Sequence, residues 1–416
     1  MCDGLETDLR RRFNVIDESR QGKSAIDQAM RLSGNATERE RGYIRAVAEL
    51  YTDFERRDQP TRVQAYERAM RALAARETAD TEAKIFHALS LAASASPTDK
   101  TYAKQLEAGR ILEEIWPKQT DHPGIAHYII HAYDYPPLAD KARQAAQRYA
   151  DVAPSAAHAL HMPSHTFTRV GMWEQSVGAN QRSMESALAS GSIAEALHAA
   201  DYIVYAYLQL GREADAKAVL DRIPSIEPRF DPNAITGAAP GWAGVFALAA
   251  MPARWVMERG AWAEAATLQP KSTTVPHADA MTHFARSIGA SRTRDTAKAR
   301  ASVDSLAALE QRLQTAGNAY WREQVAIQRL GAQAWLDLAR SREAEALRQM
   351  REAVMREDAT EKDAVTPGPL APARELLADM LVQLGRRAEA QAEYRAVLRK
   401  EPNRRRATVG LGPARN

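Results

Sequence analysis

Four histidines form two pairs whose spacing suits metal binding. His127 and His131 are four residues apart, and His161 and His165 repeat that spacing. On a helix such a pair lies on one face, with its Cβ atoms about 5–6 Å apart. Imidazole nitrogens bind transition metals at about 2.0–2.1 Å, so each pair can offer two ligands to one ion. Nitrogen ligation favours zinc, copper, nickel or iron over calcium or magnesium.

The two pairs belong to a cluster in which histidines recur with a fixed period. Six of the ten histidines lie within 44 residues: His122, His127, His131, His158, His161 and His165. The second pair follows the first by 34 residues, the length of a tetratricopeptide repeat, which is a hairpin of two antiparallel helices. Neighbouring packed helices lie about 8–10 Å apart, so two such pairs can share one ion. The sequence therefore predicts a metal site at His127, His131, His161 and His165, with His158 as a further ligand.

The rest of the chain indicates helices in pairs. Ala, Leu, Arg, Glu and Gln dominate, and apolar residues recur at intervals of three and four. In the clearest unit, Ala378, Gly385, Ala390, Tyr394 and Pro402 resemble the tetratricopeptide pattern of small, turn, aromatic and helix-stopping positions. Further copies are predicted at 123–154, from 157, at 197–228 and, more weakly, at 37–76, 82–116 and 334–359.

These repeats predict an all-α fold, a right-handed α-solenoid of tetratricopeptide-like antiparallel helix pairs. The first helix of each pair should line a concave groove, and the second should lie outside. The longest non-helical stretch divides the chain into an N-terminal half with the histidine cluster (1–228), a linker (229–241) and a C-terminal half (242–416). The basic tail around Arg404 is expected to be a solvated polar end.

Repeat numbering extends the candidate site. With Pro123 and Ala157 as position 1, the paired histidines occupy positions 5 and 9, on a stripe that resembles the ligand-facing side of tetratricopeptide domains. The next repeat places polar residues at the same positions. The additional candidates are His122, His198, Asp201 and Tyr205, and Asp134 is a candidate for a residue that orients a ligand.

Pro163 lies inside the second pair and allows two interpretations. In the first it kinks one continuous helix, because proline removes a backbone hydrogen bond. In the second it is the first residue of a later helix, which would leave His158 and His161 on a loop and separate His161 from His165. The 34-residue register, which holds on both sides of Pro163, favours the kinked helix.

Two strings of this region, HPGIAHYIIHAYDYPPLA and APSAAHALHMPSHTFTRVGMW, resemble a bacterial family of tetratricopeptide-like proteins. The resemblance implies the fold and a shared histidine site, and no reaction. Relatives tend to carry a further repeat and often an export signal before the part that matches Thr37, and this chain shows neither.

Composition and missing motifs exclude several functional classes. The net charge of +3 is too balanced to indicate nucleic acid binding. A single cysteine, Cys2, excludes a disulfide framework and thiolate zinc sites. There is no phosphate-binding loop, so no nucleotide cofactor is expected, and no apolar run of the roughly 18 residues that a membrane span needs. Without a visible signal peptide the expected location is cytoplasmic, or periplasmic or secreted if the true start lies upstream.

The function predicted from the sequence is a repeat protein whose concave groove binds a peptide or protein, with a histidine-rich metal site in that groove. The alternative is a metal-dependent enzyme, or a metal storage or delivery protein, that uses the same histidines. Explanations without a metal are a groove for a carboxylate-rich peptide and a pH-sensitive surface. His277 and His283 lack partners at useful spacing and are interpreted as packing or surface residues.

Overall fold

The computed structural model describes residues 19–96, 98–234 and 236–412, and within these ranges it contains helices and no strand. The predicted all-α fold is therefore confirmed. The chain divides into two compact units, Met1–Tyr133 and Asp134–Asn416. Cys2 lies outside the described residues. No helix in the described ranges is both long and apolar enough to cross a membrane.

The first unit is a series of antiparallel helices that pack in chain order. Residues 19–32 are helical, and a short 3-10 turn, Ser33–Asn35, follows. The remaining helices are α2 (Glu38–Glu49), α3 (Gln59–Arg76), α4 (Thr81–Ala93), α5 (Ala103–Ile115) and α6 (Pro123–Ala132). Thr37 caps α2 in a capping box with Glu40, and Asp58 caps α3 by accepting from the Thr61 amide. Each helix packs on the next, so that α6 is held by α4 and α5.

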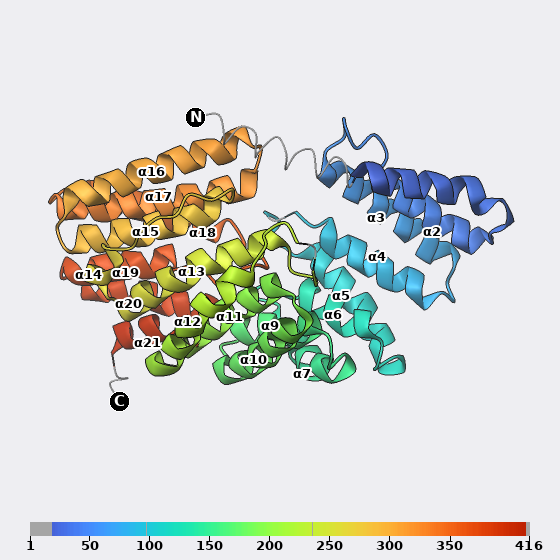
Figure 1. Ribbon diagram of the computed structural model, residues 1–416, viewed down its shortest axis with the longest axis horizontal. Helices are drawn as coiled ribbons and strands as arrows, with labels where there is room; N and C mark the ends of the chain where they lie inside the picture. The colour runs from blue at the N-terminus through green and yellow to red at the C-terminus, as the bar shows by residue number, and fades with distance from the viewer. Residues whose placement is uncertain (1–18, 97, 235, 413–416) are drawn as a thin grey trace. The chain divides into compact units, whose positions relative to one another are not determined.

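The second unit is a solenoid of helix pairs (Figure 1). Its helices are α7 (Arg143–Val152), α8 (Ala157–His161), α9 (Pro163–Arg169), α10 (Trp173–Ser190), α11 (Ile193–Gln209), α12 (Glu213–Ile226), α13 (Gly241–Arg259), α14 (Trp262–Ala265), α15 (Pro276–Arg292), α16 (Thr296–Thr315), α17 (Ala319–Ala339), α18 (Glu343–Asp358), α19 (Ala373–Gln383), α20 (Arg387–Lys400) and α21 (Arg405–Leu411). The first helices of successive pairs, α11, α13, α15, α17 and α19, pack on one another. This stacking is the arrangement that the tetratricopeptide-like repeats predict.

The residue at the turn of each helix pair explains why some repeats could be recognised in the sequence and others could not. Gly171 and Gly211 have φ values of 70° and 72°, in the left-handed region that glycine adopts without strain. In both turns a backbone bond closes the helix end, such as the Arg212 amide to the Tyr207 carbonyl at 2.9 Å. Later turns place Arg294 (φ 65°) and Ser341 (φ 61°) in the same region, so their repeats lack the glycine signal.

The stretch predicted as a linker, 229–241, lies inside the second unit, and the structure describes it except at residue 235. The helices on either side of it are α12 and α13, and α13 packs closely on α11. The Ala238 amide donates to the Glu195 carboxylate on α11 at 3.0 Å, and a Cβ on Gly244 would meet the Phe230 ring. The two compact units meet in the sequence at Tyr133 and Asp134, and the division into halves at 229–241 stays a prediction.

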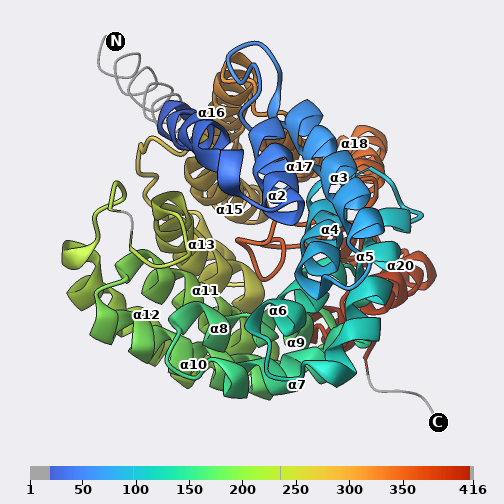
Figure 2. The ribbon, with the colours of Figure 1, turned by 90° about the vertical axis from the view of Figure 1, so that its right-hand side faces the viewer.

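A second non-helical segment, residues 359–372, lies on the inner side of the solenoid (Figure 2). Three side chains from different helices donate to its backbone carbonyls. Tyr320 Oη binds Glu361 at 2.9 Å, Tyr202 Oη binds Ala364 at 3.0 Å, and Arg254 Nη2 binds Gly368 at 3.0 Å. The concave side of the second unit thus carries a segment of its own chain.

The C-terminal tail is anchored inside the second unit by the buried side chain of Arg404. It is not the solvated end that its basic residues predicted. Arg404 is fully buried, with Nε 2.7 Å from Glu375 and Nη2 2.8 Å from Glu258. Its Nη1 donates to Tyr205 Oη at 2.8 Å. The prediction is wrong because the buried carboxylates of Glu258 on α13 and Glu375 on α19 require a cation, which Arg404 supplies.

Replacing Arg404 by Met should lower the free energy of unfolding by about 3–5 kcal/mol, since breaking a buried ion pair leaves uncompensated carboxylates. Urea denaturation followed by circular dichroism measures this change. The control is Arg395→Met on the exposed side of α20, which should change the free energy by about 0.5 kcal/mol or less. Equal stability of the two variants would contradict the internal role of the tail.

Candidate metal centre

Pro163 divides the predicted helix without separating its histidines. It is the first residue of α9, where its missing amide hydrogen costs no helical bond. Met162, between α8 and α9, keeps helical angles (φ −51°, ψ −37°), so the backbone stays in the right-handed helical conformation from α8 into α9. The sequence predicted one kinked helix, whereas the structure has two short helices, α8 and α9. His158 and His161 nevertheless lie on α8 and not on a loop.

Three imidazoles of the second unit converge on one point. His161 Nε2 lies 3.0 Å from His165 Nε2 and 3.1 Å from His198 Nε2. The residues are 3%, 2% and 9% exposed, respectively. The ligand atoms of all three lie within 4.8 Å of one another, and an ion bound at about 2.0–2.1 Å would place its nitrogen ligands about 3 Å apart, so the group could hold one ion.

Asn180 on α10 fixes the tautomer of His161. Its side-chain amide donates from Nδ2 to the Ser176 carbonyl at 2.8 Å, which turns Oδ1 towards His161. His161 Nδ1 lies 2.6 Å from Oδ1 and must donate the hydrogen. A neutral His161 therefore offers Nε2 as a lone pair.

Asp134 fixes the tautomer of His165 in the same way. Burial opposes its charge, but Lys362 at 3.3 Å and Arg169 at 2.8 Å hold the pKa of Asp134 well below its usual range. The ionised carboxylate accepts from His165 Nδ1 at 3.0 Å. Such a carboxylate partner is common behind metal-binding histidines, where it sets ring orientation and raises basicity.

The Nε2 atoms of His161 and His165 therefore carry lone pairs that face each other, and the two atoms are 3.0 Å apart. This arrangement needs a cation between them. A proton is disfavoured there. Burial lowers the pKa of His161 and of His165 well below the usual value, and lowers that of His198 to about 3. The Tyr202 ring packs against all three imidazoles, with ring centres 4.7–5.6 Å away, and covers the group. The residues fit a transition metal bound through nitrogen.

Two of the additional metal-ligand candidates, Asp201 and Tyr205 on α11, are bound to buried arginine side chains. Asp201 is bound by Arg254, with Nε to Oδ1 at 2.7 Å and both side chains fully buried. Tyr205 accepts from Arg404. Both residues lie on the predicted stripe, but their oxygen atoms accept hydrogen bonds from arginine side chains in other parts of the chain.

His122 has a local role in the first unit. It caps α6, because its Nδ1 accepts from the Gly124 amide at 3.1 Å. Its Nε2 lies 3.0 Å from the Glu82 carboxylate. Neither ring nitrogen is therefore left for a metal ligand. The packing role of His277 is visible in its parallel stacking on Trp321, with ring centres 4.0 Å apart.

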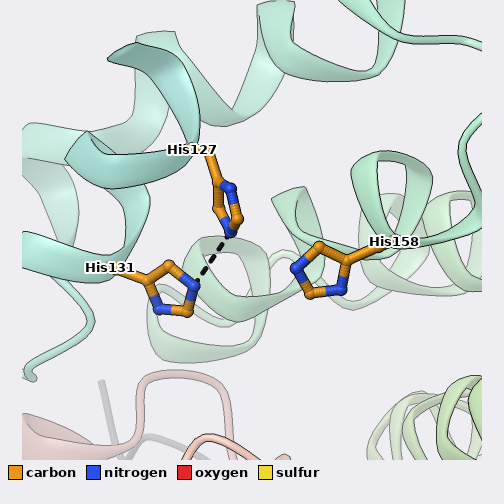
Figure 3. A group of neighbouring side chains, drawn as sticks. All are labelled: His127, His131 and His158. Atoms are coloured by element: carbon orange, nitrogen blue, oxygen red, sulfur yellow. Dashed lines mark hydrogen bonds between the residues drawn. The ribbon is translucent and has the colours of Figure 1, made fainter. Parts of the chain in front are cut away.

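The first predicted pair lies on α6 in the other unit. His127 Nε2 and His131 Nε2 are 3.0 Å apart, as the dashed line in Figure 3 shows. His158, also labelled there, belongs to α8, and its Nδ1 lies 3.9 Å from Glu195. One ion shared by both pairs, with His158 as a ligand, stays a prediction.

Sequence reasoning missed Asn180 and Lys362. Asn180 lies on the second helix of its repeat, outside the numbered stripe, and Lys362 lies in a loop far along the chain. Asparagine is unfavourable inside a helix, so Asn180 in the middle of α10 was the one available signal. Nothing in the sequence relates Lys362 to Asp134.

No protein-family model and no curated protein matches the chain. Two solved structures resemble it over most of its length. One is a chain of the APC/C hetero-tetramer Cut9–Hcn1, with TM-score 0.39 and 11% identity, covering 94% of this chain and 59% of that one. The other is the human IFIT1 dimer with m7Gppp-AAAA, with TM-score 0.41 and 10% identity, covering 98% of this chain and 88% of that one. This likeness identifies neither a family nor a ligand.

Acid should destabilise the metal-free protein through the buried histidines. An unfolded chain protonates His198 near the usual pKa of 6.5, whereas the folded chain does so only near 3. Stability is therefore present above pH 6.5 and is lost as the pH falls towards the folded pKa. His198→Asn should reduce the slope of unfolding free energy against pH by up to about 1.4 kcal/mol per pH unit between pH 6 and 4. Urea titrations in a chelating buffer measure both slopes, and identical slopes would contradict the assignment.

Proposed function

We propose that this protein is a metal-binding α-solenoid whose second unit holds one transition metal ion through Nε2 of His161, His165 and His198. The observation that carries the proposal is the pair of facing lone pairs, fixed by Asn180 and Asp134. Neutral nitrogen ligands suit zinc, copper, nickel or iron. Asn180 and Asp134 would orient the rings towards the ion.

Three histidines leave a fourth coordination position open. An ion with such a position can bind a water molecule or a substrate oxygen and polarise it. The alternatives of a metal-dependent enzyme and of metal storage or delivery share this ligand set. The protein contributes a buried group under Tyr202, which keeps bulk water from the imidazoles.

A second candidate function is the binding of a peptide or protein partner on the concave side. Its support is a cavity of about 100 Å³ beside segment 359–372, lined by aromatic residues that include Trp173, Phe246 and Trp321. This function needs no metal, so peptide capture by the purified protein should survive His161→Ala.

The metal proposal predicts about one ion per chain in purified protein, or after loading with zinc. The single variants His161→Ala, His165→Ala and His198→Ala should each lose most of it, because two nitrogens hold an ion far more weakly than three. Elemental analysis after gel filtration gives the stoichiometry. His283→Ala serves as the control and should retain the ion. Wild-type protein that stays metal-free after exposure to zinc, copper, nickel and iron would refute the proposal.

Asn180 should tune the affinity without supplying a ligand. Asn180→Leu should weaken zinc binding by about 10–100-fold, the usual effect of removing a hydrogen-bond partner of a ligating histidine. Asn180→Asp keeps the acceptor for His161 Nδ1 and should bind zinc at least as tightly as wild type. Competition with a chromophoric chelator measures both affinities. Equal weakening by both substitutions would show that Asn180 acts only through packing.

A further inference from the structure

The cavity of about 100 Å³ on the concave side lies within the second unit and is separate from the three-histidine group. None of those histidines lines it. The rings of Trp173, Phe246 and Trp321 form part of its wall, and His277 stacks on Trp321 with ring centres 4.0 Å apart. The cavity is smaller than the roughly 150 Å³ that binds benzene, so its size and its wall suit a short alkyl group.

Two residues that line the cavity each keep a buried oxygen atom without a hydrogen-bond donor among the described residues. The atoms are Gln328 Oε1 on α17 and Glu401 Oε2, directly after α20. Arg404 Nη1 lies 3.5 Å from the Glu401 atom, too far for a hydrogen bond, and donates to Tyr205 Oη at 2.8 Å. A buried acceptor without a donor is costly, so both atoms favour an occupant that donates hydrogen bonds.

The cations that line the same cavity are paired with carboxylates that do not line it. The pairs are 2.7–3.8 Å apart and join Arg169 and Lys362 to Asp134, Arg254 to Asp201, and Lys400 to Asp358. The lining arginines and lysines therefore have anions of their own, and the cavity needs no anionic occupant to balance them.

The carboxylates of the wall, in contrast, would gain from a further cation. They are Glu357, Glu361 and Glu401. Burial outweighs the nearby Lys400 and raises the pKa of Glu401, and it raises the pKa of Glu357 to about 7. A positive charge inside the cavity would favour the ionised form of both groups.

We infer that the cavity binds a primary ammonium group on a short alkyl chain, with Glu401 as its counter-ion and Gln328 as a further acceptor. An ammonium group supplies three donors and one positive charge, and aromatic rings attract such cations. A free amine or a lysine side chain of a bound peptide carries this group. For a lysine, the inference rests on the second candidate function, the binding of a peptide on the concave side.

The test measures the binding of n-butylamine, which is protonated at pH 7, to the full chain in a chelating buffer. The neutral and anionic counterparts of similar size are n-butanol and butyrate, and sodium chloride keeps the ionic strength equal. By isothermal titration calorimetry we expect saturable binding of n-butylamine with a Kd of about 1 mM, the range for so small a ligand. The other two compounds should bind at least about tenfold more weakly, because they lack the charge.

Two variants assign the binding to this cavity. Glu401→Gln removes the charge, and it should weaken n-butylamine by about tenfold and leave n-butanol unchanged. Gln328→Met removes an acceptor and should weaken n-butylamine by about two- to tenfold. The control is Glu389→Gln on α20, whose side chain is 47% exposed and which should bind as wild type does. Circular dichroism checks folding, and Gln328→Met decides the matter if Glu401→Gln does not fold.

A pair of tripeptides distinguishes the two sources of the ammonium group. They are acetyl-Gly-Lys-Gly-amide and its norleucine counterpart, which lacks the charge. A lysine peptide that binds more tightly than n-butylamine assigns the group to a partner protein, and one that binds more weakly assigns it to a free amine. Both results support the inference.

Three results would overturn the inference: no saturable binding of either ammonium probe, equal binding of the three butyl compounds, or unchanged n-butylamine affinity in both cavity variants. Capture of the norleucine peptide alongside any of these would leave the second candidate function standing. The proposed metal function is tested separately, because the chelating buffer removes the ion from these measurements.

Discussion

Two hydrogen bonds on the far side of the imidazoles determine what this site can do. Asn180 holds the Nδ1 hydrogen of His161, and Asp134 holds that of His165. Because both hydrogens are committed, the Nε2 atoms meet as lone pairs in a buried space. Two lone pairs at hydrogen-bond distance repel each other unless a cation lies between them. The site therefore depends on these two tautomers more than on the number of histidines.

The solenoid supplies the rigidity that such a site needs. Asn180 comes from α10 and His198 from α11, and these two helices pack against each other. Every residue of α11 is buried, so the helix cannot shift without disturbing the core. The ion pair of Asp201 with Arg254 and the bond of Tyr205 with Arg404 tie α11 to distant parts of the chain. Asp201 and Tyr205 thus help to hold the helix that carries His198.

The sequence predicted the helix pairs and the convergence of His161 with His165, because both follow from local periodicity. The position of His198 near the pair followed from the same numbering, one repeat later, and its Nε2 lies 3.1 Å from His161 Nε2. The contacts of Asp201 with Arg254 and of Tyr205 with Arg404 could not be predicted, since the numbering locates a helix face and not the cation that meets it. Asn180 and Lys362 could not be predicted as partners of the site, because their contacts depend on helix packing and on a loop that returns from the far end of the unit.

A crystal structure of the zinc-loaded protein, with anomalous diffraction at the zinc edge, tests the central claim most directly. The account predicts an anomalous peak about 2.0–2.1 Å from Nε2 of His161, His165 and His198, with Asn180 and Asp134 still bound to the two Nδ1 atoms. An oxygen ligand should complete the coordination. Fully loaded crystals without a peak at these three atoms, or with zinc bound through Nδ1, would contradict it.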